Sequence, residues 1–161
     1  MATESPSSRR TWRVMVGWSA VALNLLVSCL WAFWGAIENF HEGWHHGHLG
    51  LNLLWSLAYL GPMLAAILLG LLGLRWPRLG GLAYLIAGGY FAYRFLFGRI
   101  GRMSGAGILL ALLMAGGCGL IGLLFWFGQP RPRRLAYHLT WGLPVAVALV
   151  SGAASAALSG G

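Results

Sequence analysis

Five long apolar runs follow one another along this sequence, separated by short gaps. They cover residues 14–37, 51–74, 79–97, 106–127 and 139–158. A helix needs about 20 mostly apolar residues to cross the roughly 30 Å hydrocarbon core of a bilayer, and each run has about that length. The runs therefore predict an all-α fold, namely a polytopic transmembrane helical bundle with five helices.

The charge content favours lipid around most of the chain. Only 9% of the 161 residues are charged and 58% are hydrophobic, whereas about a quarter of the residues in a soluble domain are charged. We favour this interpretation over a soluble protein with an unusually apolar core. The net charge of +8 comes from eleven Arg against three Glu. Because the Arg residues lie between the apolar runs, they indicate topology rather than a nucleic-acid surface.

The distribution of Arg predicts the orientation in the membrane. With the N-terminus in the cytoplasm, the cytoplasmic segments hold eight Arg and the opposite side holds three, which is the bias expected of membrane proteins. Together with Arg in place of Lys, which is typical of GC-rich bacterial genomes, this predicts a multi-pass protein of a bacterial cytoplasmic (inner) membrane with an extracytoplasmic C-terminus. The run 79–97 contains an Arg and the run 139–158 is diluted by small residues. If either does not span, the C-terminus lies in the cytoplasm.

Polar residues at the start of the chain predict a short tail ahead of the helices. We expect residues 1–10 to form a disordered cytoplasmic N-terminus. The sequence has no internal repeat and no long polar linker. Residues 11–161 are therefore predicted to form a single transmembrane bundle domain.

The segment 38–48, ENFHEGWHHGH, is the polar stretch that stands out between the runs. It holds four of the five His and two of the three Glu, and the predicted topology places it on the extracytoplasmic side. We regard it as the candidate functional loop, carried by Glu38, His41, Glu42 and Trp44.

The histidines of this loop allow three interpretations. Neutral imidazole binds Zn or Cu, and a metal site here would use His41, His45, His46 and His48. The string HEGWH at 41–45 also matches HExxH of zinc proteases, with Glu42 as the base. However, Gly43 weakens a helix at this point, and no acidic residue after Glu42 can serve as a third ligand. We favour the third interpretation, an interfacial loop at the lipid headgroups with no cofactor.

Arg94 is the one charged residue inside an apolar run. A cation at the centre of the bilayer costs about 2.5–3.5 kcal/mol, but Arg94 lies near the end of its run and can extend to the surface. In the predicted topology the first and third runs end on the same side, so Glu38 or Glu42 can pair with Arg94. We favour this structural role over substrate binding.

Small residues four positions apart predict close helix packing. The pairs are Ala66 with Gly70, Ala115 with Gly119, and Cys118 with Gly122. They indicate association within one chain, with a membrane protein partner, or between copies in a homo-oligomer. A transporter more typically shows two matching broken helices or buried charges, and the prolines at 62 and 144 are only a faint sign of that.

Several strings along the chain occur in a recognisable order. They are ENFHEGW at 38–44, NLL at 52–54, YLGPM at 59–63, RWPRLGG at 75–81, WFGQPRPRRLAY at 126–137 and GLP at 142–144. Together they resemble a family of uncharacterised bacterial multi-pass integral membrane proteins, over residues 31–144. The resemblance implies a multi-pass fold but carries no established activity. The family pattern does not require His at position 45, which argues further against a protease.

These features predict an integral membrane protein of unknown molecular activity. We expect a non-enzymatic anchor, scaffold or accessory protein, whose partners are the lipid bilayer and a membrane protein or second copy, and not nucleic acid. The alternative is a small transporter or a metal or solute sensor that uses the loop 38–48. A membrane zinc metalloprotease is the least favoured hypothesis.

Overall fold

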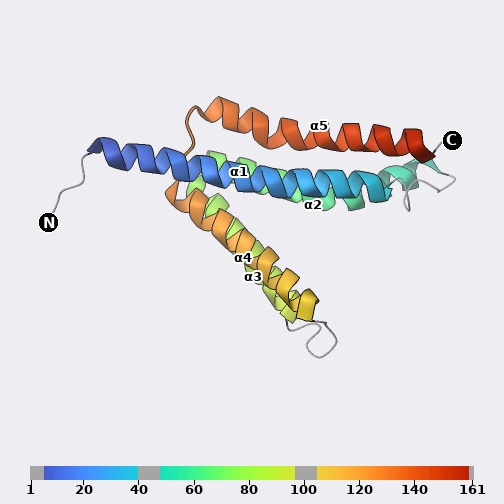
Figure 1. Cartoon of the computed structure of the whole chain (residues 1–161), viewed down its shortest axis with the longest axis horizontal. Coiled ribbons are helices and arrows are strands. Elements are labelled where there is room, and N and C mark those ends of the chain that lie inside the picture. The colour runs from blue at the N-terminus through green and yellow to red at the C-terminus, as the bar shows by residue number, and fades with distance from the viewer. Residues whose placement is uncertain (1–5, 40–47, 97–104, 160–161) are drawn as a thin grey trace. The chain divides into compact units, whose positions relative to one another are not determined.

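The computed structural model describes residues 6–39, 48–96 and 105–159. The secondary structure of these residues is helical, in the order α1 (Pro6–Glu38), α2 (Leu49–Arg75), α3 (Pro77–Leu96), α4 (Gly105–Phe127) and α5 (Arg133–Ser159) (Figure 1). Each helix overlaps one of the five apolar runs. The predicted all-α fold with five helices is thereby confirmed.

Four of the five described helices are long and apolar enough to cross a membrane. The candidate spans are Arg10–Glu38, Leu49–Arg75, Gly107–Phe127 and Arg133–Leu158. Helix α3 is not among them over its described length, which is 20 residues and includes Arg78 and Arg94. The two arginines contribute to this result, because each lowers the hydropathy of the helix.

Helix α1 extends well beyond the apolar run that predicted it. It begins at Pro6, so residues 6–10, for which we predicted disorder, are helical. Proline fits the first position of a helix because its missing N–H would have no partner there. Hydropathy marks only the part of a helix that suits lipid, and the polar residues before it continue the same helix.

The connection between α2 and α3 is a single residue, Trp76, as expected for the tight turn predicted at residues 75–78. The Trp76 N–H donates to the Leu72 carbonyl (2.7 Å), and the Gly80 N–H donates to the Trp76 carbonyl (2.9 Å). The Arg75 guanidinium lies 5.5 Å from the centre of the Trp76 ring. The turn is short because the backbones of Gly73 and Gly80 meet directly, with no room for a Cβ on Gly80.

The chain divides into two compact units, each described by itself. Unit 1 comprises Met1–Ala20 and Leu72–Arg133, and unit 2 comprises Val21–Leu71 and Arg134–Gly161. Helices α1 and α2 therefore contribute residues to both units. The single domain predicted for residues 11–161 stays a prediction.

The core of unit 1 lies along α3 and α4, which run side by side (Figure 1). Phe125 is fully buried, and its ring stacks on Tyr84 with centroids 5.9 Å apart. A Cβ on Gly73 would lie 2.8–2.9 Å from atoms of the Phe125 ring, so the ring fills the space that this glycine leaves. One aromatic side chain of α4 thus packs against both α3 and the end of α2.

Small residues bring α3 and α4 together, as the spacing predicted. A Cβ on Gly88 would lie 2.9 Å from the Ala115 carbonyl oxygen and 3.1 Å from the Cys118 Cβ. Gly122 is equally close to α3, since a Cβ there would lie 2.8 Å from the Gly81 carbonyl oxygen. Gly119 differs, because a Cβ on it would meet nothing within 4 Å.

In unit 2, α2 and α5 pack against α1. The buried centre consists of Ala32 of α1 with Met63 and Ile67 of α2. Around it lie the partly buried side chains of Trp31, Leu60, Leu64, Leu71, Val145, Val147 and Ala148. Gly35 of α1 lies against the Tyr59 carbonyl of α2, where a Cβ would overlap the oxygen.

Candidate functional site

The structure describes the two ends of the predicted functional loop, and a hydrogen bond ties its start to α2. Asn39, which directly follows α1, is buried. Its side-chain oxygen accepts a hydrogen bond of 3.0 Å from the Ser56 hydroxyl of α2. The same hydroxyl lies 2.8 Å from the Asn52 carbonyl, one turn earlier in α2. The amide of Asn39 thus anchors the start of the loop to the first turns of the helix that follows it.

His48 stands at the other end of the loop, immediately before α2, and is exposed. Its carbonyl accepts hydrogen bonds from the N–H groups of Leu51 (3.0 Å) and Asn52 (3.2 Å), which begin the helical pattern. Glu38, the last residue of α1, is half-buried. The described ends of the loop therefore hold a carboxylate and an imidazole.

Replacing Ser56 with Ala is expected to lower the free energy of unfolding by roughly 0.6 kcal/mol and by no more than about 1.7 kcal/mol, the average and the maximum measured for hydrogen bonds between helices in a membrane. The loss comes from the Asn39 oxygen, which is left buried without its donor. Unfolding by SDS in mixed micelles measures the change. Ser19→Ala is the matched control, because Ser19 is an exposed serine of α1. Equal effects of the two substitutions would contradict the structural role of the Asn39–Ser56 bond.

The remaining loop residues of the predicted site lie outside the described residues. They are His41, Glu42, Trp44, His45 and His46. The part of the chain that is described, which leaves out residues 40–47, holds no group of three or more His, Cys, Asp or Glu able to bind a metal ion. Since three of the four predicted His ligands fall in that gap, the Zn or Cu site stays a prediction.

Arg94, the predicted ion-pair partner of the loop, is exposed in the last turn of α3. It belongs to unit 1, whereas Glu38 belongs to unit 2, and Glu42 lies outside the described residues. The pairing of Arg94 with either carboxylate stays a prediction.

A buried polar layer crosses unit 2. Asn24 and Ser28 of α1 and Thr140 of α5 are fully buried. The Ser28 hydroxyl donates to the Leu25 carbonyl (3.2 Å). Gly70 of α2 leaves the space between the other two, because a Cβ on it would lie 2.9 Å from the Thr140 methyl carbon and would overlap the Asn24 amide nitrogen. Because Gly70 has no side chain, the side chains of Asn24 and Thr140 fit beside it in the interior.

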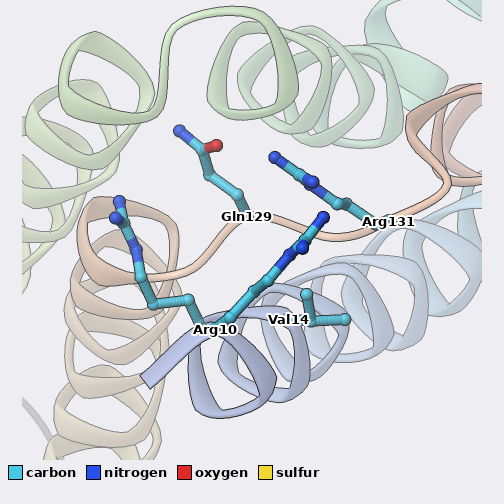
Figure 2. Close-up of a pocket in the computed structure, with 5 residues that line it drawn as sticks. Arg10, Val14, Gln129 and Arg131 are labelled. Carbon is cyan, nitrogen blue, oxygen red and sulfur yellow. The ribbon is translucent and has the colours of Figure 1, made fainter. Parts of the chain in front are cut away.

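A second polar site, which sequence reasoning did not single out, is a cavity of about 250 Å³ in unit 1. Its lining comes from the start of α1 and from the segment between α4 and α5. The lining residues are Arg10, Arg13, Val14, Gln129 and Arg131. Figure 2 shows the side chains of Arg10, Gln129 and Arg131 extending to the same side of the backbone. We call this site the arginine cavity.

Backbone contacts hold the two walls of the arginine cavity together. The Gln129 N–H donates to the Arg13 carbonyl (2.9 Å), and the Trp18 indole N–H donates to the Arg131 carbonyl (2.9 Å). Gly17 lies directly against Gln129 and Pro130, with no room for a Cβ. The Arg133 guanidinium donates to the Gln129 side-chain oxygen (3.2 Å). One sequence signal pointed here: the predicted topology puts the Arg clusters at 9–13 and 131–134 on one side of the membrane.

No family model, no curated protein and no solved structure matches this chain. The family resemblance therefore stays a prediction, and a functional conclusion rests on the chemistry of the described residues.

Proposed function

We propose that this chain is a multi-pass integral membrane protein that serves as a non-enzymatic anchor, scaffold or accessory protein. The observation that supports the membrane location is the exposed apolar surface of its helices. Leu68 of α2 and Leu149 of α5 are 66% and 69% exposed, and at most 39% of the residues in any candidate span are buried inside the protein. So much exposed apolar surface requires lipid or another apolar partner.

The buried polar groups support a role in packing rather than catalysis. Those described are the amides of Asn24, Asn39 and Asn52 and the hydroxyls of Ser28 and Thr140. Such groups cannot serve as acids or bases near neutral pH. Among them, the Asn39 amide accepts a hydrogen bond from Ser56 of α2, and bonds of this kind fix how helices pack in a membrane.

We further propose that all five helices cross the membrane, with the N-terminus in the cytoplasm and the C-terminus outside, in a bacterial cytoplasmic membrane. Helix α3 needs a separate argument, because it contains two arginines. Arg78 is its second residue, and Arg94 is two residues from its described end. Both can extend to opposite surfaces of the bilayer, which removes most of the cost of a charge in lipid. Packing of α3 along α4 supports the same arrangement.

Membrane insertion and topology can be tested together. We expect the protein to remain in the membrane pellet after washing at alkaline pH and to be released by detergent. A reporter fused after Gly161 is expected to give an extracytoplasmic signal, and a second reporter inserted near Gly47 should give the same signal. A cytoplasmic signal at Gly161 combined with an extracytoplasmic one at Gly47 would mean an even number of crossings, and α3 or α5 would then not span.

The accessory role is tested against transport. The purified protein in liposomes is expected to leave the permeability to ions and small solutes unchanged. A specific flux, reduced by substitutions in the loop 38–48, would refute the proposed function and favour the transporter alternative.

A further inference from the structure

The described lining of the arginine cavity carries positive charge and no acidic side chain. Three of its five lining residues, Arg10, Arg13 and Arg131, are arginines, and the other two are uncharged. The chain contains only three acidic residues, and none of them follows Glu42. Like charges that line one cavity repel one another. An anion in the cavity would relieve that repulsion.

Hydrogen bonds hold the backbone of the arginine cavity in place. The carbonyls of Arg13 and Arg131 each accept a hydrogen bond at 2.9 Å from the opposite wall, from Gln129 and Trp18 respectively. These bonds fix the backbones that carry the two arginines. The backbone of the site is therefore held in place before an anion binds, and the cost of ordering it at binding is small.

The guanidinium group selects the chemistry of the ligand. Its planar fork of N–H donors matches the oxygens of phosphate and can bind two of them at once. The cavity of about 250 Å³ has room for such a group, and the Gln129 amide adds a further donor. A carboxylate would satisfy fewer of these donors than a phosphate.

Apolar neighbours indicate where the rest of the ligand lies. Val14 lines the cavity, while Trp12 and Met15 on the same turn of α1 are 55% and 64% exposed. A basic site beside exposed apolar side chains is the arrangement that binds anionic lipid headgroups at the cytoplasmic face of membrane proteins. The phosphate would occupy the cavity, and the acyl chains would lie along α1.

From these observations we propose that the arginine cavity binds a phosphate group of an anionic molecule, in the form of a lipid headgroup or free phosphate. The lipid form rests on the proposed membrane location. Binding of inorganic phosphate to the detergent-purified protein does not, so the two proposals can fail separately.

Native mass spectrometry of the detergent-purified full chain tests the proposal, with phosphatidylglycerol as the probe. We expect the wild type to retain one lipid molecule. The variant R10Q/R131Q is expected to bind it about 25-fold more weakly, or about fivefold for each arginine whose hydrogen bond to the phosphate is lost. The matched control is R78Q/R134Q, which removes the same charge from exposed arginines outside the cavity and should bind as the wild type does. Inorganic phosphate is then added as a competitor.

Displacement of the lipid by phosphate would show that the phosphate group alone is recognised, and retention would show that the lipid form is required. Either result supports the proposal when R10Q/R131Q is the weaker variant. Equal weakening of the two double variants, or binding of neither the lipid nor inorganic phosphate by the wild type, would overturn it. Should R10Q/R131Q not purify in folded form, the single variant Arg10→Gln is expected to bind about fivefold more weakly than Arg78→Gln.

Discussion

Replacing Gly80 with Ala is expected to lower the thermal midpoint of the detergent-purified protein by about 5 °C or more. The added Cβ would overlap the backbone of Gly73 and lie 3.0 Å from the Leu72 carbonyl carbon. Only Trp76 connects α2 to α3, so the two helices cannot separate without breaking the turn. Overpacking of this kind costs about 1–3 kcal/mol, which corresponds to a few degrees per kcal/mol in a chain of this size. Fluorescence of the nine Trp residues on heating provides the measurement.

The matched control is Gly89→Ala in the same helix. Gly89 is exposed, and a Cβ on it would meet nothing within 4 Å. Both substitutions raise helix propensity by up to about 1 kcal/mol, so Gly89→Ala should be neutral or stabilising. The difference between the thermal midpoints of the two variants therefore measures the effect of the steric overlap alone. If Gly80→Ala melts at or above the temperature of Gly89→Ala, the direct contact of α2 with α3 is disproved.

The helices of this protein could be predicted from sequence because lipid imposes one simple requirement. A spanning segment must be apolar over about 20 residues and must satisfy its own backbone. The run 51–74 therefore predicted α2 (Leu49–Arg75) to within two residues at each end. For α1 the same rule missed eight residues, since Pro6 and the residues after it form helix outside the apolar run.

Contacts between helices were harder to predict, because hydropathy does not say which face meets which neighbour. Small-residue spacing found Gly70 and Gly122 at close contacts, yet it selected Gly119, where a Cβ would meet nothing. It overlooked Gly73 and Gly80, whose contact depends on the hairpin at Trp76. Spacing along one helix cannot show this, because the partner glycine lies on the next helix.

The arginine cavity illustrates the same limit for a functional site. Arg10 and Arg131 are separated by 120 residues, and each was interpreted as a topology signal by itself. Their common place in one cavity follows from the hydrogen bonds between Gln129 and Arg13 and between Trp18 and Arg131. The loop 38–48 shows the opposite case. Its His- and Glu-rich composition identified it as a candidate functional loop from sequence alone, while the structure describes only its two ends.

Phe125→Ala is expected to cost about 2 kcal/mol in free energy of unfolding, the largest effect of any single truncation proposed for this chain. Phe125 is 0% exposed, stacks on Tyr84 and fills the space left by Gly73. In a water-soluble core the loss would be roughly 3–5 kcal/mol. Part of that value is transfer of the ring from water, which is absent when the unfolded helices remain in lipid or detergent. Lost packing contacts and the cavity account for the remainder.

The control for this prediction lies two residues further along α4. Phe127 is 52% exposed, so truncation removes few packing contacts, and Phe127→Ala should change stability by no more than about 0.5 kcal/mol. Unfolding by SDS in mixed micelles measures both variants on one scale. Phe125→Leu is expected to recover much of the loss, because a branched apolar side chain fills most of the cavity. If the two alanine variants lose equal stability, burial of Phe125 between α2, α3 and α4 does not hold unit 1 together.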